Sequence, residues 1–132
     1  MSSNHAQHQI GLHLIWCPKY RHPVLVGAVE VVLKEILAET CSHYQWSIEA
    51  LEVMPDHVHL FLQIDPYTRP VDVASTLKSI SAVKLFASFP KLKARKFWGS
   101  GLWSPSTYYG SVGQVNESTI RNYIEQQKRH GP

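Results

Sequence analysis

The sequence has few cysteines, few charged side chains and no long hydrophobic run. Its two cysteines, Cys17 and Cys41, are too few for the disulfide framework of a small secreted domain, so we expect reduced thiols and a cytoplasmic location. No apolar run approaches the roughly 20 residues that a membrane-spanning helix needs. Residues 1–8 lack the hydrophobic region of a signal peptide. We therefore expect neither a secreted scaffold nor a membrane protein.

Charge of neither sign dominates the chain. Charged residues make up 17% of the sequence and hydrophobic residues 44%, with a net charge of +3. This balance is typical of a folded globular protein, and the mild basic bias permits nucleic-acid binding without being evidence for it. The length of 132 residues predicts one domain over residues 1–132, with frayed tails at 1–8 and 129–132.

Apolar residues recur with the spacings of strands and helices in a definite order. The predicted strands are residues 8–16, 46–54, 57–64 and 106–112, and the predicted helices are residues 27–44, 71–89 and about 116–128, the last capped by Asn116. We expect the strand at 46–54 to direct Trp46, Ile48, Ala50 and Glu52 to one face, and residues 91–96 to form a basic connector after Pro90 ends the second helix.

The order strand, helix, strand, strand, helix, strand, helix predicts an α+β protein. It is the split βαβ pattern of a ferredoxin-like antiparallel sheet, here with an extra C-terminal helix. Two helices would cover one face of the sheet. The other face needs a cover, which the third helix could provide from the same chain or from a second subunit.

The stretch 54–64, with the sequence MPDHVHLFLQI, alternates between apolar residues and a second set that contains two histidines. On a strand, Val58, Leu60 and Leu62 would point to the core, and His57 and His59 to the other face with Cα atoms about 7 Å apart. The alternatives are a metal-binding pair and a solvated strand face. Two histidines are few for zinc, so an added oxygen ligand and waters around Mg²⁺ or Mn²⁺ fit better.

Tyr123 and Gln127 lie four residues apart in the last predicted helix, so they share one helix face. Gln127 could supply the oxygen ligand, although a surface glutamine is the simpler interpretation. Tyr123 could be a nucleophile or an ordinary packing residue. A free tyrosine has a pKa near 10, so about one molecule in a thousand is ionised at neutral pH, a handicap that a metal polarising the phosphate would offset.

Several segments together resemble a known family, the single-tyrosine HUH transposases (TnpA) encoded by insertion sequences of the IS200/IS605 type. The order and spacing of the segments and the Tyr-x-x-x-Gln ending carry the resemblance, which runs from about residue 12 to residue 128. The matching segments are Leu14-Ile15-Trp16-Cys17-Pro18-Lys19-Tyr20-Arg21, Met54-Pro55-Asp56-His57-Val58-His59-Leu60, Leu77-Lys78, Leu102-Trp103-Ser104-Pro105-Ser106 and Tyr123-Ile124-Glu125-Gln126-Gln127.

The resemblance implies a metal-dependent enzyme that cleaves and rejoins single-stranded DNA at the ends of an insertion sequence. It implies that His57, His59 and Gln127 bind Mg²⁺ or Mn²⁺, and that Tyr123 is the nucleophile forming a 5′-phosphotyrosine intermediate. It also implies recognition of DNA hairpins, and a homodimer with composite active sites in which the tyrosine helix of one subunit reaches the histidines of the other.

Two groups of basic residues are candidate phosphate contacts, with nearby aromatic rings for base stacking. The plainer interpretation of each basic run is a solvated face. The candidate DNA contacts are Lys19, Tyr20, Arg21, Lys78, Lys91, Lys93, Arg95 and Trp103. Two competing functions remain open, a domesticated HUH nuclease acting on palindromic chromosomal repeats and a non-catalytic nucleic-acid-binding module on the same fold.

Overall fold

A four-stranded antiparallel sheet organises the chain. The computed structural model describes residues 9–97, 101–111 and 117–129, and in the last range it describes the side chains of residues 118 and 121–126. The sheet order is β2-β3-β1-β4, and every neighbouring pair is antiparallel. This is the predicted ferredoxin-like arrangement. The strands are β1 (Ile10–Trp16), β2 (Ser47–Met54), β3 (His57–Ile64) and β4 (Tyr108–Ser111).

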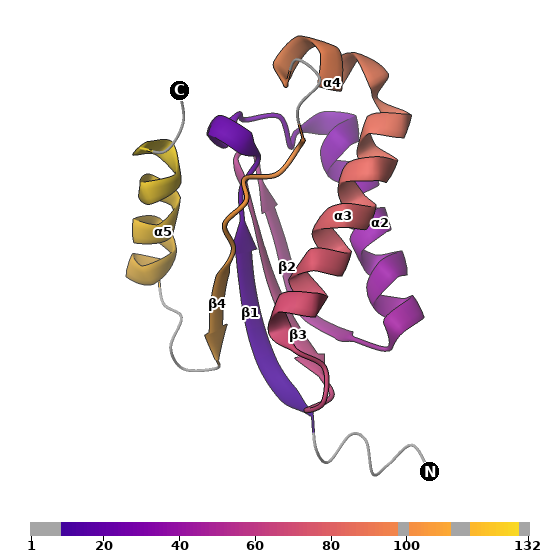
Figure 1. Cartoon of the computed structure of the whole chain (residues 1–132), viewed down its shortest axis with the longest axis vertical. Coiled ribbons are helices and arrows are strands. Elements are labelled where there is room, and N and C mark those ends of the chain that lie inside the picture. The colour runs from indigo at the N-terminus through magenta and orange to yellow at the C-terminus, as the bar shows by residue number, and fades with distance from the viewer. Residues whose placement is uncertain (1–8, 98–100, 112–116, 130–132) are drawn as a thin grey trace.

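Helices lie on both sides of this sheet. Figure 1 shows α2 (Gly27–Tyr44) and α3 (Pro70–Ser88) on one side and α5 (Glu117–Arg129) on the opposite side, next to β4 and β1. The main core lies between the sheet and the first two helices, where apolar side chains of β1 and β3 meet those of α2 and α3. The extra C-terminal helix is therefore on the face that carries His57 and His59.

The alternation predicted for the strand at 57–64 is confirmed. Its burial alternates along all eight residues of β3, with Val58, Leu60, Leu62 and Ile64 fully buried. His57 and His59, together with the other two residues of their set, are only partly buried on the opposite face. The core side of β3 thus fixes both histidines on the same face of the sheet.

The predicted facing of β2 is wrong over half of the strand. The pairing of β2 with β3 is irregular between Ile48, opposite Leu62, and Ala50, opposite Phe61. The extra residue reverses the alternation, as a β-bulge does. Ile48 therefore faces the core, while Ala50 and Glu52 are exposed and Val53 is buried. Glu52 lies opposite His59 and so belongs to the histidine face.

Residues 91–96 are helical rather than a connector, which is a second correction. Pro90 opens a short helix, α4 (Pro90–Lys96), because proline is well suited to the first position of a helix. Phe89 separates it from α3 with φ −130° and ψ 70°, since the residue before a proline avoids helical geometry. The basic loop after β1 also contains a 3-10 turn, η1 (Lys19–Arg21).

The remaining predicted boundaries agree to within one or two residues. The last helix extends to Arg129, one residue beyond its predicted end and into the predicted C-terminal tail. Residues 1–8, residues 130–132 and the predicted cap Asn116 lie outside the described ranges. Within those ranges, no helix combines the length and the apolar character needed to cross a membrane.

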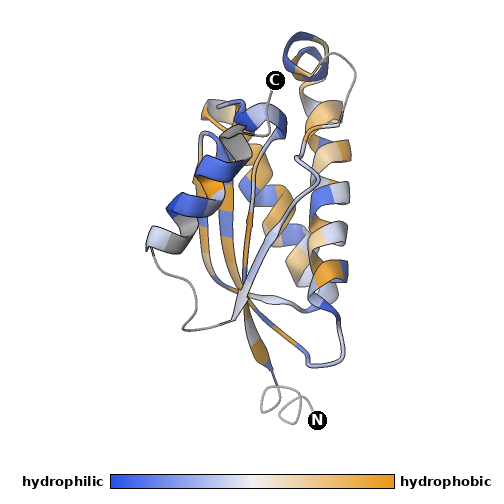
Figure 2. Cartoon of the chain, turned by 60° about the vertical axis from the view of Figure 1, so that its left-hand side comes forward, coloured by the Kyte–Doolittle hydropathy of each residue, from blue (hydrophilic) through white to orange (hydrophobic). Residues whose placement is uncertain are grey.

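The surface of α5 differs from that of the other long helices. Figure 2 shows α5 as largely hydrophilic where it is coloured, whereas α2, α3 and the strands carry bands of hydrophobic residues. The residues of the main core and those packed against it come from the sheet, α2, α3, α4 and the loops that join them, and none comes from the described part of α5. Polar contacts must therefore contribute much of what holds this helix in place.

Candidate active site

His57 begins β3 and is held by its neighbour in the chain. Its Nδ1 lies 2.9 Å from Oδ1 of Asp56, and its side chain is only 12% exposed. With Nδ1–H donating to the carboxylate, Nε2 keeps its lone pair. A carboxylate that orients a histidine in this way is the usual outer partner of a metal-binding imidazole. His57 is thus prepared to donate Nε2 to a cation.

His59 lies between two side chains from neighbouring strands. Its Nε2 is 3.0 Å from Nδ1 of His13 on β1, and Glu52 stands opposite it on β2. His13 is itself stacked on Phe61, with ring centroids 4.3 Å apart and an interplanar angle of 3°. The site therefore contains a third imidazole, which is brought to His59 by the pairing of β1 with β3.

The environment of His59 favours its neutral form. Burial lowers its pKa below the usual 6.5, the nearby imidazoles of His13 and His57 lower it further, and the carboxylate of Glu52 opposes them. A neutral imidazole is the form that binds a metal ion. At neutral pH, His59 is accordingly ready to act as a ligand without first losing a proton.

We expect the His13→Asn variant to raise the pKa of His59, because the substitution removes a group that disfavours the imidazolium. The Glu52→Gln variant should lower the same pKa, because it removes a negative charge. NMR titration of the histidine ring protons in metal-free protein measures both shifts. If both variants moved the His59 pKa in the same direction, this description of its surroundings would be contradicted.

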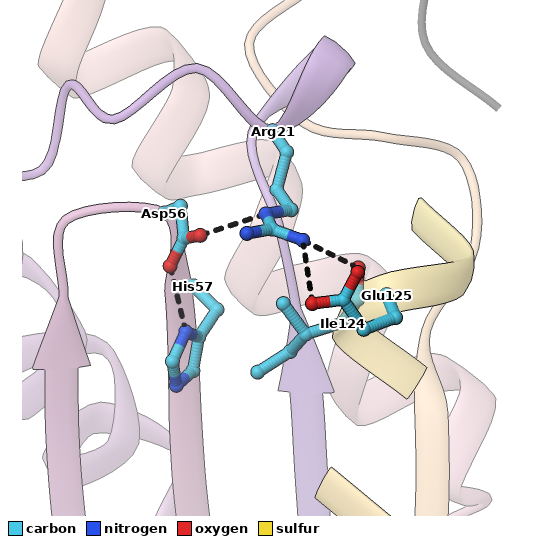
Figure 3. A network of polar contacts seen from close by, with 5 residues as sticks. All are labelled: Arg21, Asp56, His57, Ile124 and Glu125. Atoms are coloured by element: carbon cyan, nitrogen blue, oxygen red, sulfur yellow. Dashed lines mark hydrogen bonds and ion pairs between the residues drawn. The ribbon is translucent and has the colours of Figure 1, made fainter. Parts of the chain in front are cut away.

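Arg21 connects the turn that precedes β3, called here the histidine turn (Pro55–Asp56), to the last helix (Figure 3). Its Nε donates to Oδ2 of Asp56 over 2.7 Å, and its Nη1 donates to the backbone carbonyl of Ile124 over 3.2 Å. The same nitrogen lies 3.8 Å from Oε2 of Glu125. One carboxylate thus holds His57 with one oxygen and Arg21 with the other, and Arg21 reaches the residue that follows Tyr123.

The hydroxyl of Tyr123 is engaged by the loop before β4. Its Oη lies 3.2 Å from Oγ of Ser106 and donates to the Ser106 carbonyl over 3.3 Å, and its ring packs beside Tyr108 at 6.0 Å. Burial raises the pKa of Tyr123 to about 12, while the hydrogen bond from Ser106 opposes this shift. Among the described residues, no hydrogen bond or ring contact joins Tyr123 to His57 or His59. The tyrosine is therefore outside the hydrophobic core, but it is held as an un-ionised phenol.

Lys78 organises the loop that holds Tyr123. Its ammonium donates to the carbonyls of Ser104 and Ser106 over 2.9 and 3.1 Å, and to Oγ1 of Thr107 over 3.0 Å. These acceptors match the three donors of the ammonium group. Burial lowers the pKa of Lys78 to about 8. Lys78 was predicted to contact DNA, and in this structure its donors are directed at protein oxygens.

The two histidines lie on one face of β3 and could supply two nitrogen ligands to a divalent cation. Among the described residues, no group of three or more histidine, cysteine, aspartate or glutamate side chains is arranged to hold a metal. The remaining ligands would then be of another kind, as predicted for an amide oxygen and water. The backbone of Gln127 lies in α5, four residues after Tyr123, but its side chain falls outside the described residues.

The predicted DNA contacts differ in accessibility. The three cations of α4, namely Lys91, Lys93 and Arg95, are exposed, and Tyr20 is 39% exposed. Lys19 is partly buried and donates its backbone N–H to Leu102.

Trp103 does not agree with the prediction that it contacts DNA. It is only 7% exposed, its indole N–H donates to Ser81 over 3.0 Å, and it packs edge-on against Trp16. An indole in this position has little surface left for stacking on a base. A β-bridge between Pro18 and Trp103 brings this ring against the core.

Sequence reasoning missed two parts of the site, His13 and the network around Arg21. The alternation of His13 between Leu12 and Leu14 could have placed it on the polar face of its strand. No sequence pattern, however, could show that it would lie beside His59. Arg21 was predicted to contact DNA, and no role was predicted for Asp56, because no sequence pattern reveals that these two residues are partners.

The fold and the site together define a class of protein. It is a ferredoxin-like domain with an HUH histidine pair on the sheet face opposite α2 and α3, and with Tyr123 on the helix that lies on this face. A family model described as IS200-like transposase, Y1_Tnp, matches residues 6–127. The chain belongs to this family of transposases.

Individual relatives agree with this assignment. The ISDra2 transposase TnpA of Deinococcus radiodurans is 43% identical over 120 residues, which are 91% of this chain and 85% of the relative. The transposase of insertion sequence element IS200 from Salmonella typhimurium is 28% identical over 123 residues, or 93% of this chain and 80% of the relative.

Solved structures share the fold. A crystal structure from Deinococcus radiodurans R1, described as that of a transposase, has a TM-score of 0.84 and 42% identity over 90% of this chain and 91% of that one. The structure of a REP-associated tyrosine transposase bound to a REP hairpin has a TM-score of 0.56 over 92% of this chain and 68% of that one. At 16% identity, the second structure supports the fold alone.

Proposed function

We propose that this transposase cleaves and rejoins single-stranded DNA at the ends of an insertion sequence, with Tyr123 as the covalent nucleophile. The observation that carries the proposal is the position of α5, which Arg21 joins to the turn bearing His57. Such a reaction needs a nucleophile and groups that can bind a metal ion. Here a tyrosine on α5 and two imidazoles on β3 lie on the same side of the sheet.

The first step would form a bond between Oη of Tyr123 and the scissile phosphorus. The phenol loses its proton, the bond from phosphorus to the 3′ oxygen breaks, and the departing oxygen takes up a proton to become a 3′-OH. The product is a 5′-phosphotyrosine. In the second step a 3′-OH of another DNA end attacks this phosphorus, and the tyrosine is released as a phenol. The two steps conserve one phosphodiester bond.

The raised pKa of Tyr123 sets the main chemical requirement. With a pKa of about 12, the phenol is almost entirely protonated at neutral pH. A divalent cation held by His57, His59 and Gln127, either Mg²⁺ or Mn²⁺, would supply positive charge that polarises the phosphate. The Asp56 carboxylate would keep His57 in the tautomer that leaves Nε2 available.

Basic surface near the site supports a single-stranded nucleic-acid substrate. Phe97 directly follows α4 and packs against His22, which directly follows η1, with ring centroids 5.4 Å apart. The exposed cations of α4 and Lys19 of η1 therefore lie on neighbouring segments. We infer that they bind phosphates of a DNA hairpin, and we expect affinity to fall as salt rises because bound counterions are released.

A homodimer with composite active sites is part of the same proposal. In a single chain Arg21 joins α5 to its own η1. In a composite site, Arg21 of one chain would make the same contact with α5 of its partner. Mixed dimers of Tyr123→Phe and His57→Ala chains separate the two arrangements. Only a site that combines residues of two chains would regain activity in such a mixture.

The decisive experiment is a covalent-adduct assay. The protein is mixed with single-stranded DNA that carries the hairpins flanking its gene, with Mg²⁺ or Mn²⁺ present. We expect a species that resists denaturant and yields, after proteolysis, a nucleotide-bearing peptide containing Tyr123. Duplex DNA without hairpins is the matched control. Cleavage without any protein–DNA adduct would overturn the proposal.

A further inference from the structure

We propose that Arg21 is a positioning residue that fixes α5, and with it Tyr123, relative to the histidine pair. The effect of Arg21 on catalysis rests on the proposed function. Its effect on the position of α5 is a property of the folded chain alone. The sequence had suggested only that Arg21 touches phosphate.

A continuous series of short contacts connects the metal-binding edge to the nucleophile helix. It runs from His57 Nδ1 to Asp56 Oδ1 at 2.9 Å, from Asp56 Oδ2 to Arg21 Nε at 2.7 Å, and from Arg21 Nη1 to the Ile124 carbonyl at 3.2 Å. Figure 3 shows the guanidinium between the carboxylate on one side and α5 on the other. Ile124 directly follows Tyr123, so this contact acts within one residue of the nucleophile.

Burial and side-chain chemistry suit Arg21 to this position. The side chains of Arg21 and Asp56 are 20% and 23% exposed, so water screens their charges less than those of a surface pair. The planar guanidinium presents donors in a fixed geometry and reaches both partners at once. A lysine would offer a single flexible ammonium in place of that rigid fork.

The backbone around Arg21 supports the same role. Tyr20 and Arg21 have φ angles of 60° and 54°, in the left-handed region that residues other than glycine rarely adopt. Such conformations persist where the surroundings determine them, and they cluster at functional sites. Here the η1 turn directs Arg21 inward, between the histidine turn and α5, instead of out toward solvent.

The hydrophilic character of α5 makes this contact matter. No described residue of α5 belongs to the main core, so contacts outside that core, several of them polar, hold the helix in place. Ser106 holds the Tyr123 hydroxyl, and Arg21 holds the backbone of the next residue. Without Arg21, α5 would lose the contact made at the residue next to the nucleophile. A displacement of the nucleophile by only 1 Å can lower the reaction rate by about 100-fold.

The hold on α5 is measured by hydrogen exchange of the full-length protein, without DNA or metal. We expect the backbone amides of α5 to exchange about tenfold faster in Arg21→Gln and in Arg21→Lys than in the wild type. Arg69→Gln is the matched control, because it removes an exposed Arg–Asp ion pair of similar length at the N-terminus of α3. Exchange in α2 and α3, which should not change, reports whether a variant is folded.

The consequence for catalysis is measured as a single-turnover rate of adduct formation at saturating DNA. We expect about a 10- to 100-fold lower rate in both Arg21 variants, with DNA affinity within about twofold of the wild type. A phosphate contact would behave differently. If Arg21 contacted a phosphate, Arg21→Gln would bind DNA more weakly and with a smaller salt dependence. Arg21→Lys, which keeps the positive charge, would retain most of the DNA affinity.

Each outcome decides the proposal. Unchanged α5 exchange in folded Arg21→Gln would overturn it, as would faster exchange with an unchanged adduct rate. A DNA-affinity loss that lysine rescues would assign Arg21 to the DNA instead. If the wild type formed no adduct, the proposed function would fail while the exchange experiment still tested the hold on α5. Non-additive effects of Asp56→Asn and Arg21→Gln on that exchange would confirm their coupling.

Discussion

The Tyr123→Phe variant is expected to form no covalent adduct with DNA, with a rate at least about 10⁴-fold below that of the wild type. Removal of a catalytic nucleophile has effects of this size because the remaining groups cannot replace the attacking atom. The variant keeps the ring beside Tyr108 and loses only the hydrogen bonds to Ser106, so the fold should survive. Denaturing electrophoresis of protein mixed with labelled hairpin DNA measures the adduct.

Tyr108→Phe is the matched control for this experiment. Tyr108 lies next to Tyr123 and is the alternative source of a phenol oxygen close to the site. We expect this variant to form adduct at a rate within a fewfold of the wild type. An equal yield of adduct in Tyr123→Phe and in the wild type would show that another residue is the nucleophile, and loss of adduct only in Tyr108→Phe would identify that residue.

The His57→Ala variant is expected to lose affinity for Mn²⁺ and to form adduct at least about 100-fold more slowly. Removing a residue that only orients a metal ligand typically lowers metal affinity or activity 10- to 100-fold, so removing a ligand itself should lower them further. The substitution also leaves the Asp56 carboxylate without its imidazole partner. Calorimetric Mn²⁺ titration measures the affinity, and the adduct assay with and without chelator measures the activity.

His43→Ala provides the comparison, since His43 is an exposed histidine near the end of α2, on the side of the sheet away from the site. It should bind Mn²⁺ and form adduct as the wild type does. If His57→Ala retained every DNA activity in full, the catalytic interpretation of the histidine pair would be wrong. A non-catalytic nucleic-acid-binding module would then be the better description of this chain.

The features predicted well from the sequence are those that depend on near neighbours. The alternation along β3 places His57 and His59 on one face because Val58 and Leu60 require the core, and this needs only a short window of sequence. The order of strands and helices follows in the same way. Residue identity and spacing then suggested the tyrosine helix, whose position beside the histidine face agrees with the structure.

The features that were missed depend on distant pairs or on a single irregular residue. His13 and His59 are 46 residues apart and meet only through the register of β1 and β3. Arg21 is 35 residues from Asp56 and 103 from Ile124. The facing of Glu52 was predicted wrongly because a bulge adds one residue, which no periodicity reveals.

The layered core and the nucleophile belong to separable parts of this chain. The sheet and the helices packed on it are complete by Ser111, and the hydrophilic last helix adds its tyrosine from outside that core. A premature stop codon shortly after β4 would therefore leave a folded product with both histidines and no attacking phenol. Under the proposed function, such a product would retain the basic surface while losing cleavage, and in a decaying mobile element it would compete with intact copies for DNA.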